Sequence, residues 1–411
     1  MNFARALGVD AKASDTGISV LVAAVGASVH LSGVSRHAAN LARCLLSRNE
    51  VSTVHFAVAP WQLESFRSAM PTDHSRLHLH VVQSGKNAVA RNYWYYKQLP
   101  TLARKLNVDI VHLSYPAPLY RKAFACPVVV TLHDLYPYDI PANFGWPKMF
   151  FNRAILQQCL RAADVVACVS VSTLRRLDIY APGIAIEKAV TIYNCVDRGP
   201  VMAAAGPLPK WQREPFLLCV AQHRRNKNVV LAMQVFQRLL RSGDIAPSTR
   251  LGVVGIDGPE TGRIRRFIRS SGLAGSIDLL AGISDAELEW CYGHCELLLA
   301  PSSVEGFGLP VVEAMLHHCR VVCSDIPAFR EVGGAYCYYA DLQGDAVEAL
   351  CDATRLALRS HKFRVALTDI FSSRQAAVQY VQLYTRLHNA NATPNKICHY
   401  KQFPTFERGQ P

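Results

Sequence analysis

The chain has 411 residues, more than one ordinary hydrophobic core supports, which predicts two domains of roughly 150–200 residues each. Half of the residues are hydrophobic and 18% are charged, a composition that excludes a disordered chain and indicates a globular one. The formal net charge of +13 predicts an anionic partner, such as a phosphorylated small molecule, an anionic membrane surface or a nucleic acid.

The thirteen cysteines are scattered and lie mostly in apolar segments, which predicts reduced thiols packed as small core residues in a reducing compartment. Two close pairs, Cys291 with Cys295 and Cys319 with Cys323, lack the Cys-x-x-Cys spacing of a zinc ribbon, so we expect no metal there. Residues 1–16 lack the apolar stretch of a signal peptide, and no apolar run reaches the roughly 20 residues that span a bilayer. We therefore expect a cytoplasmic protein that can associate with a membrane at its cytosolic face.

The first half of the chain alternates short β-branched runs with longer amphipathic segments. Several of the runs are apolar almost throughout, as in parallel strands covered on both faces. We expect strands at residues 18–26, 51–58, 77–82, 109–113, 127–132, 165–169 and 189–192. Between the first two, residues 34–46 place Val34, Ala38, Leu41 and Leu45 on one face of a helix. This alternation predicts a doubly wound α/β domain over residues 1–197.

One segment of this first domain, residues 91–99, combines four aromatic rings with flanking Lys and Arg. Aromatic rings among cations suit a membrane interface or stacking on a sugar. The same pattern is also typical of an ordinary amphipathic core helix, and the sequence leaves both interpretations open.

Residues 197–215 break the alternation with several prolines, which predicts a linker. A second α/β domain is then expected over residues 198–370, so that the fold class is α/β with two similar domains facing a cleft. Strands are expected at residues 216–221, 250–254, 277–280, 297–300, 320–323 and 335–339, and helices at 228–241, 285–291 and 310–317. Residues 371–388 predict one last helix, and residues 389–411 lack periodicity and predict a mobile tail.

The loop after the expected strand 297–300 carries the densest chemistry, since open parallel sheets bind ligands at the carboxyl ends of their strands. Gly306 and Gly308 let backbone N–H groups approach a ligand, and a helix starting near Pro310 favours phosphate at its N-terminus. Glu305 in the loop and Glu313 in the first turn of that helix are expected to face one pocket, where carboxylates can accept O–H bonds from sugar or ribose diols. Taken alone, each carboxylate is better explained as a solvated loop residue or a partner of the helix dipole. Residues 302–313 taken together are not explained in this way.

That string, from Ser302 through Glu305 to Glu313, resembles the signature of the retaining GT-B glycosyltransferases known as family 4, or group 1. The similarity covers most of the chain, because residues 131–135, 170–172, 194–197 and 324–334 also resemble motifs of that family. Residues 371–388 resemble the closing helix that crosses back to the first domain. The resemblance implies a GT-B fold, in which two Rossmann-like domains, an acceptor-side one and a donor-binding one, face a cleft.

The resemblance also implies roles for individual residues. Glu313 would hold the ribose hydroxyls of a nucleotide-sugar donor, and Glu305 would hold hydroxyls of the transferred sugar near the reacting face. His133 would contact that sugar from the opposite domain. Taken alone, the pair His133-Asp134 is more typical of two loop residues whose side chains are hydrogen-bonded within the protein. The donor oxygens would be bound by the backbone of the loop at Gly306, Phe307, Gly308 and Leu309.

The resemblance further implies a basic pair that binds the donor diphosphate as its charge grows. Lys227 matches the lysine of this pair, but the arginine is displaced, so either Arg224 or Arg225 would serve. Ser32 replaces one of two glycines that the family places near the donor phosphate, which weakens the role assigned to its neighbour Gly33. No Asp-x-Asp motif follows a strand, so we expect a metal-independent reaction without a cofactor, with a GDP-, UDP- or ADP-sugar as donor.

These features together predict a retaining hexosyltransferase, mannose slightly favoured, that glycosylates a glycan or lipid-linked acceptor in polysaccharide biosynthesis. Retention would proceed without a protein general base, the leaving phosphate taking the acceptor proton. A GT-B sugar-nucleotide epimerase is one alternative, and it would form product without an acceptor. A basic protein that binds nucleic acid is another, although the chain contains no recognisable nucleic-acid module.

Overall fold

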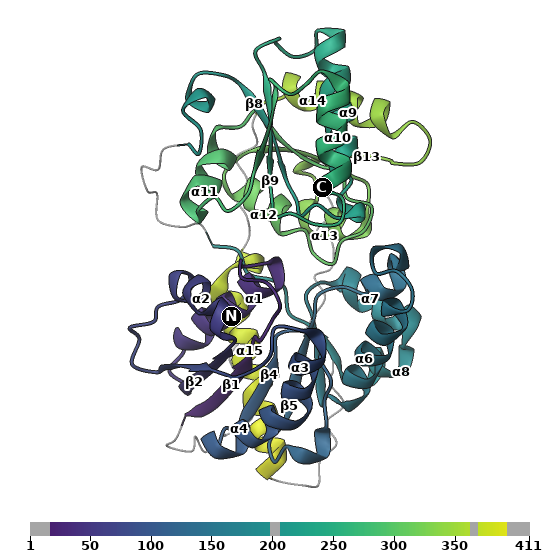
Figure 1. Ribbon diagram of the computed structural model, residues 1–411. Helices are drawn as coiled ribbons and strands as arrows, with labels where there is room; N and C mark the ends of the chain where they lie inside the picture. The colour runs from purple at the N-terminus through teal and green to yellow at the C-terminus, as the bar shows by residue number, and fades with distance from the viewer. Residues whose placement is uncertain (1–16, 198–205, 362–368, 393–411) are drawn as a thin grey trace, which may run out of the picture.

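The computed structural model describes residues 17–197, 206–361 and 369–392, which form two α/β domains stacked one on the other (Figure 1). A seven-stranded sheet lies in the N-terminal domain and a six-stranded sheet in the C-terminal domain. The strands in both sheets pair in parallel, so all of their carboxyl ends gather at one edge of each sheet. This confirms the predicted doubly wound α/β class.

The N-terminal sheet has the order β3-β2-β1-β4-β5-β6-β7. Each strand falls within a predicted run, and the bounds are β1 Ile18–Ala23, β2 Val51–Val58, β3 Leu77–Val81, β4 Ile110–Leu113, β5 Val128–Leu132, β6 Val165–Cys168 and β7 Ala189–Thr191. The first strand is shorter than its apolar run, because the backbone N–H of Gly26 has left the sheet to donate to the Gln62 side chain.

Helices cover both faces of this sheet. Side chains alternate along β1, so that Val20 and Val22 belong to one core while Leu21 and Ala23 belong to the other. The helices are α1 Gly33–Leu46, α2 Leu63–Ala69, α3 Ala88–Tyr93, α4 Leu99–Leu106, α5 Tyr136–Asp139, α6 Lys148–Ala162, α7 Val171–Tyr180 and α8 Pro182–Lys188.

A single π turn, Trp94–Gln98, joins α3 to α4 within the aromatic segment 91–99. Trp94 and Tyr95 are buried in the N-terminal core, whereas Tyr93 and Tyr96 are exposed. Trp94 and Tyr95 therefore agree with the interpretation as a core helix, and Tyr93 and Tyr96 do not.

The C-terminal sheet has the order β10-β9-β8-β11-β12-β13. Its strands are β8 Phe216–Val220, β9 Arg250–Val254, β10 Ile277–Leu280, β11 Leu297–Ala300, β12 Arg320–Ser324 and β13 Cys337–Ala340. Its helices are α9 Val229–Ser242, α10 Thr261–Ser271, α11 Asp285–His294, α12 Leu309–Leu316, α13 Pro327–Gly333 and α14 Ala346–Arg359. As the sequence suggests, Ser284 caps α11, and Glu287 completes a capping box.

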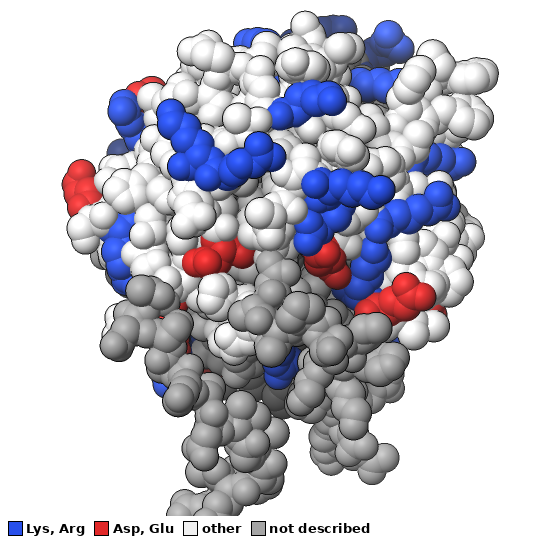
Figure 2. All heavy atoms as spheres, turned by 90° about the horizontal axis from the view of Figure 1, so that it is seen from below, with Lys and Arg blue, Asp and Glu red and all other residues white. Residues whose placement is uncertain are grey.

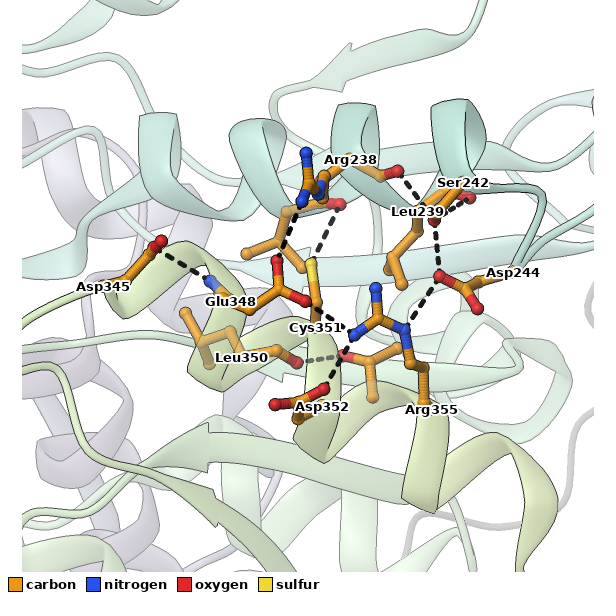
Figure 3. Close-up of polar contacts among 12 residues, drawn as sticks. Arg238, Leu239, Ser242, Asp244, Asp345, Glu348, Leu350, Cys351, Asp352 and Arg355 are labelled. Carbon is orange, nitrogen blue, oxygen red and sulfur yellow. Dashed lines mark hydrogen bonds and ion pairs between the residues drawn. The ribbon is translucent and has the colours of Figure 1, made fainter.

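On one face of this sheet, ion pairs clamp α9 to α14 (Figure 3). The Arg355 guanidinium binds Glu348 at 2.8 Å on its own helix and Asp244, which follows α9, at 2.9 Å. Glu348 in turn lies 3.4 Å from Arg238 on α9. The cluster thus joins two outer helices of the C-terminal domain.

The last helix, α15 Ser373–Ala392, returns to the N-terminal domain and lies along α1 (Figure 1). Its inner face belongs to the N-terminal core through Ala376, Ala377, Tyr380, Val381, Leu383, Tyr384 and Leu387. The helix continues through Ala392, four residues beyond its predicted end at residue 388. Residues 393–411 lie outside the described part of the chain.

Candidate active site

The two domains meet where the carboxyl ends of their sheets face each other, and the loop after β11 makes the contact. The carbonyl of Gly306 accepts hydrogen bonds from Ser170 Oγ at 2.5 Å and Thr173 Oγ1 at 3.0 Å, both in the N-terminal domain. A Cβ atom on Gly306 would lie 1.7 Å from the carbonyl oxygen of His133, a distance that no side chain tolerates. Glycine is therefore required because two backbones touch across the cleft.

Glu305, the residue before this contact, is bound from both domains. Its Oε1 accepts from Lys227 Nζ at 2.5 Å, and its Oε2 accepts from the Tyr136 hydroxyl at 3.1 Å. The Glu305 side chain is 10% exposed and that of Lys227 18%, so the ion pair is largely shielded from water. The structure thus brings together two predicted residues and adds Tyr136, which follows the His133-Asp134 pair.

Asp134 lies beside this group of charges. Burial raises the pKa of its carboxyl to about 6, and the neighbouring charges of Arg224 and Lys227 act in the opposite direction. Arg224 is half-buried and its charge also acts on Tyr136, whereas Arg225 is exposed. Of the two candidate arginines, Arg224 is the one whose charge reaches the cleft.

His133 lies at the end of β5 and carries a defined tautomer. Its Nε2–H donates to the carbonyl oxygen of Ser114 at 2.8 Å, and burial lowers its pKa to about 4. The imidazole is therefore neutral near pH 7, and its Nδ1 is left as a hydrogen-bond acceptor. This state suits an interaction with a hydroxyl group.

Beneath His133 lies a buried polar network that the sequence did not reveal. His112 contacts the Tyr384 hydroxyl at 2.6 Å through Nδ1 and Thr131 Oγ1 at 2.7 Å through Nε2. The ring of His37 approaches Thr131 at 3.2 Å and packs edge-on against His133 with centroids 4.9 Å apart. The network connects α15 to the floor of the cleft.

Glu313 occupies the other end of the loop, in a different setting from Glu305. The helix α12 begins at Leu309, so Glu313 lies in its second turn, and its expected place in the first turn is wrong. Its Oε2 accepts from the Tyr292 hydroxyl at 2.7 Å. Burial raises the pKa of the Glu313 carboxyl, and the Tyr292 hydroxyl and the charge of Arg36 oppose that rise.

Two residues of the loop before α12, Gly308 and Phe307, have roles set by packing. Gly308 precedes α12 with a φ of +104°, and a Cβ there would lie 2.8 Å from the Phe329 ring. The Phe307 side chain is buried and packs against Phe371 with ring centroids 5.5 Å apart. At Phe307, therefore, only the backbone can face a ligand.

The amino end of α1 faces this loop from the N-terminal domain. A Cβ on Gly33 would lie 3.8 Å from Leu309 Cδ1, so Gly33 lies opposite the first residue of α12. Ser32, which replaces the second glycine, caps α1 by accepting from the Ser35 N–H at 3.3 Å. One turn further along the helix, Arg36 forms an ion pair with Asp285 of α11 at 2.6 Å.

Among the residues that the structure describes, no group of three or more His, Cys, Asp or Glu side chains is arranged to hold a metal ion. Within the same part of the chain, no helix combines the length and apolar character needed to cross a membrane. The twelve described cysteines are buried free thiols, and Cys295 Sγ lies 3.2 Å from Cys319 Sγ.

The arrangement of two Rossmann-like domains around a cleft defines a class of protein, the GT-B fold. A sucrose-phosphate synthase from Thermosynechococcus elongatus has this arrangement, with a TM-score of 0.65 and 17% identity over 91% of this chain and all of that one.

Two family models match the sequence, Glycosyltransferase Family 4 over residues 31–199 and Glycosyl transferases group 1 over residues 206–367. Together they take in most of the chain, and the chain belongs to the group 1 glycosyltransferases, as its motifs predict.

Two curated proteins that resemble this chain in sequence are mannosyltransferases by name. The O-antigen chain mannosyltransferase RfbU of Salmonella typhimurium is 26% identical over 242 residues, which cover 58% of this chain and 63% of RfbU. The matched part of the chain therefore spans less than two thirds of the length of RfbU. The GDP-mannose:cellobiosyl-diphosphopolyprenol alpha-mannosyltransferase of Xanthomonas oryzae is 24% identical over 293 residues, 69% of this chain and 72% of that protein.

Proposed function

We propose that this protein is a retaining hexosyltransferase that transfers mannose from a nucleotide-diphosphate sugar to a glycan or lipid-linked acceptor in polysaccharide biosynthesis. The observation that carries the proposal is Glu305, which is bound by Lys227 of its own domain and by Tyr136 of the N-terminal domain, next to the contact between Gly306 and the His133 carbonyl. GDP-mannose is the proposed donor, which the names of the mannosyltransferase relatives support. A lipid-linked acceptor would place the protein at the cytosolic face of a membrane.

The charges in the cleft suit a diphosphate. Arg224 and Lys227 are cations beside the buried Asp134, and a donor diphosphate would bind them with charge-assisted hydrogen bonds. These bonds strengthen as the leaving group gains charge, so the cations would favour the transition state over the bound substrate. Arg224, together with Lys227 if the diphosphate shares it with Glu305, would offset part of the diphosphate charge, and we therefore propose a reaction that is independent of a metal.

The two carboxylates and the histidine suit hydroxyl groups. Glu313, half-buried and hydrogen-bonded to Tyr292, would accept from the ribose diol, and Glu305 would accept from the sugar. His133 Nδ1 would accept from a sugar hydroxyl on the opposite side of the cleft. In this arrangement the bond between sugar C1 and phosphate oxygen breaks, the acceptor oxygen bonds C1 on the same face, and its proton passes to the leaving phosphate.

A thermal-shift panel of GDP-, UDP- and ADP-sugars tests the donor site. We expect a GDP-sugar to raise the Tm of the wild-type protein and Glu313→Ala to lose most of that rise, because the ribose hydroxyls lose their acceptor. Glu64→Ala is the matched control, since its side chain is 83% exposed on α2. If no nucleotide sugar shifts the Tm of the wild-type protein, the donor site is wrong.

Product analysis tests the reaction itself. Incubation with GDP-mannose and a lipid-linked glycan acceptor is expected to yield an α-linked mannoside, the anomeric configuration of the donor. A β-linked product would contradict retention, and a changed nucleotide sugar formed without any acceptor would indicate an epimerase instead.

A further inference from the structure

Three large aromatic side chains at the start of α6 face water. Trp146 is 76% exposed, Phe150 54% and Phe151 66%, and the rings of Trp146 and Phe150 lie 4.8 Å apart. Soluble proteins scatter single apolar side chains over their surfaces, but three adjoining aromatic rings make a patch that calls for a partner.

The local structure holds these rings outward. The C-terminal half of α6 is anchored in the core by Leu156, Cys159 and Leu160, while its first turn projects beyond the core. Arg153, in the second turn, donates from Nε to the carbonyl of Pro137 at 2.8 Å and connects α6 to the preceding segment.

The segment that carries the rings is basic. Residues 140–163 contain Lys148, Arg153 and Arg161 and neither Asp nor Glu, and Asp139 and Asp164 lie directly outside this range. At the other end of the N-terminal domain, seen from below and away from the C-terminal domain, Lys and Arg side chains are also more numerous than Asp and Glu (Figure 2). Tryptophan side chains next to cations are typical of protein surfaces that lie at the headgroup level of an anionic bilayer.

The patch also lies next to the cleft. Asn143, three residues before Trp146, donates from Nδ2 to Asn226 Oδ1 of the C-terminal domain at 3.2 Å. Asn226 is the neighbour of Lys227, so one short segment connects the patch to the ion pair of Glu305. A surface that binds to these three aromatic side chains therefore lies close to the cleft between the two domains.

We infer that Trp146, Phe150 and Phe151, together with Lys148, form the surface that docks this protein on an anionic phospholipid bilayer. The inference rests on the proposed function in one respect, that the acceptor is lipid-linked and the bilayer delivers it to the cleft. The aromatic segment 91–99 is the weaker candidate, because Trp94 and Tyr95 are buried and the Tyr96 ring already stacks on Tyr120 at 5.5 Å.

Vesicle co-sedimentation of the full chain tests the inference. Vesicles of phosphatidylcholine with one third phosphatidylglycerol are compared with vesicles of phosphatidylcholine alone. The wild-type protein is expected to bind the anionic vesicles, and a triple variant with Trp146, Phe150 and Phe151 changed to Ser is expected to lose about tenfold or more in partitioning. Since these side chains are exposed, the Tm and its shift with a nucleotide sugar are expected to stay unchanged.

Two control variants separate this surface from others. Leu356→Ser removes a 59% exposed leucine from α14 in the other domain, and Val89→Ser with Tyr93→Ser alters the exposed part of α3. Both are expected to bind vesicles as the wild-type protein does. Unchanged binding by the triple variant, equal binding to neutral vesicles, or a dimer that the triple variant disperses would each overturn the inference.

Failure of the proposed function gives a different pattern. Vesicle binding that depends on the patch, without any Tm shift from a nucleotide sugar, would contradict the donor site and leave the docking surface standing. A Tm shift without vesicle binding would do the reverse.

Discussion

Glu331 of α13 connects the two domains through a helix terminus. Its Oε1 accepts from the Val171 N–H at 2.7 Å, and its Oε2 accepts from the Ser172 N–H at 2.8 Å and Ser172 Oγ at 2.5 Å. Val171 and Ser172 are the first residues of α7, whose backbone N–H groups have no partner within the helix. A carboxylate of one domain thus binds the positive end of a helix in the other, and this contact would be lost if the two domains moved apart.

Glu331→Ala removes all three bonds at once. Hydrogen bonds to a charged group contribute about 1.5–3 kcal/mol each, but they are not additive, and water replaces them when the domains separate. Removing a half-buried carboxylate from a helix terminus should therefore cost about 2–4 kcal/mol of closure free energy, roughly a 30- to 900-fold shift toward the open form. Glu331→Gln keeps one acceptor oxygen without the charge and is expected to fall between wild type and Ala.

Small-angle X-ray scattering measures this change directly, since an open form has a larger radius of gyration. Under the proposed function, kcat/KM for mannosyl transfer falls by at least about tenfold in Glu331→Ala, because the cleft residues come from both domains. Asp325→Asn is the matched control, as it breaks an exposed ion pair with Arg330 on the same helix and leaves α7 untouched. An unchanged scattering curve together with kcat/KM within twofold of wild type would refute the reasoning.

Gly306→Ala should abolish mannosyl transfer and lower the Tm, since the new Cβ would overlap the His133 carbonyl; wild-type activity and Tm would contradict the contact. Arg224→Ala should weaken donor binding in the thermal-shift assay by at least about tenfold and Arg225→Ala by less than twofold, and equal losses would place both arginines at the diphosphate. Donor affinity should rise as pH falls through about 6, because a protonated Asp134 no longer competes with the diphosphate for cations. Calorimetric titration between pH 5 and about 8 measures this dependence; Asp134→Asn should flatten it, and an affinity that rises with pH would contradict the assignment.

Much of the fold follows from local patterns. The runs around Val20 and Val129 are apolar on both faces, which only a strand covered by helices on two sides explains. The predicted end of β1 was three residues too late, since nothing local shows that Gly26 turns away to bond with Gln62. Local sequence thus fixes which elements exist more firmly than where they end.

The site was predictable only in part, because its contacts join residues far apart in the chain. Lys227 and Glu305 could be placed together, since both follow neighbouring strands of one sheet, β8 and β11. Tyr136 carries no signal that it will cross the cleft to Glu305, 169 positions away. His112 and Tyr384 are separated by 272 positions and meet only because α15 returns to the first domain.

The placement of Glu313 shows how a small local error matters. Pro310 is a good first-turn residue, which suggested that the helix starts there and that Glu313 lies near its free N–H groups. Gly308 instead takes a φ of +104° and lets the helix begin at Leu309. Glu313 is thereby moved to the second turn, where its oxygen meets the Tyr292 hydroxyl rather than backbone N–H groups.

The contacts of the two carboxylates bear on the mechanism as well as on binding. A general base needs a free oxygen lone pair aimed at the acceptor and a pKa near the working pH. Glu305 already accepts a hydrogen bond on each oxygen, from an ammonium and a phenol, so neither oxygen is aimed at an acceptor. His133 donates its only proton to Ser114 and has a pKa of about 4, so it is a weak base near pH 7. These groups suit the holding of hydroxyls, which supports a reaction in which the leaving phosphate, fixed by Arg224 and Lys227, takes the acceptor proton.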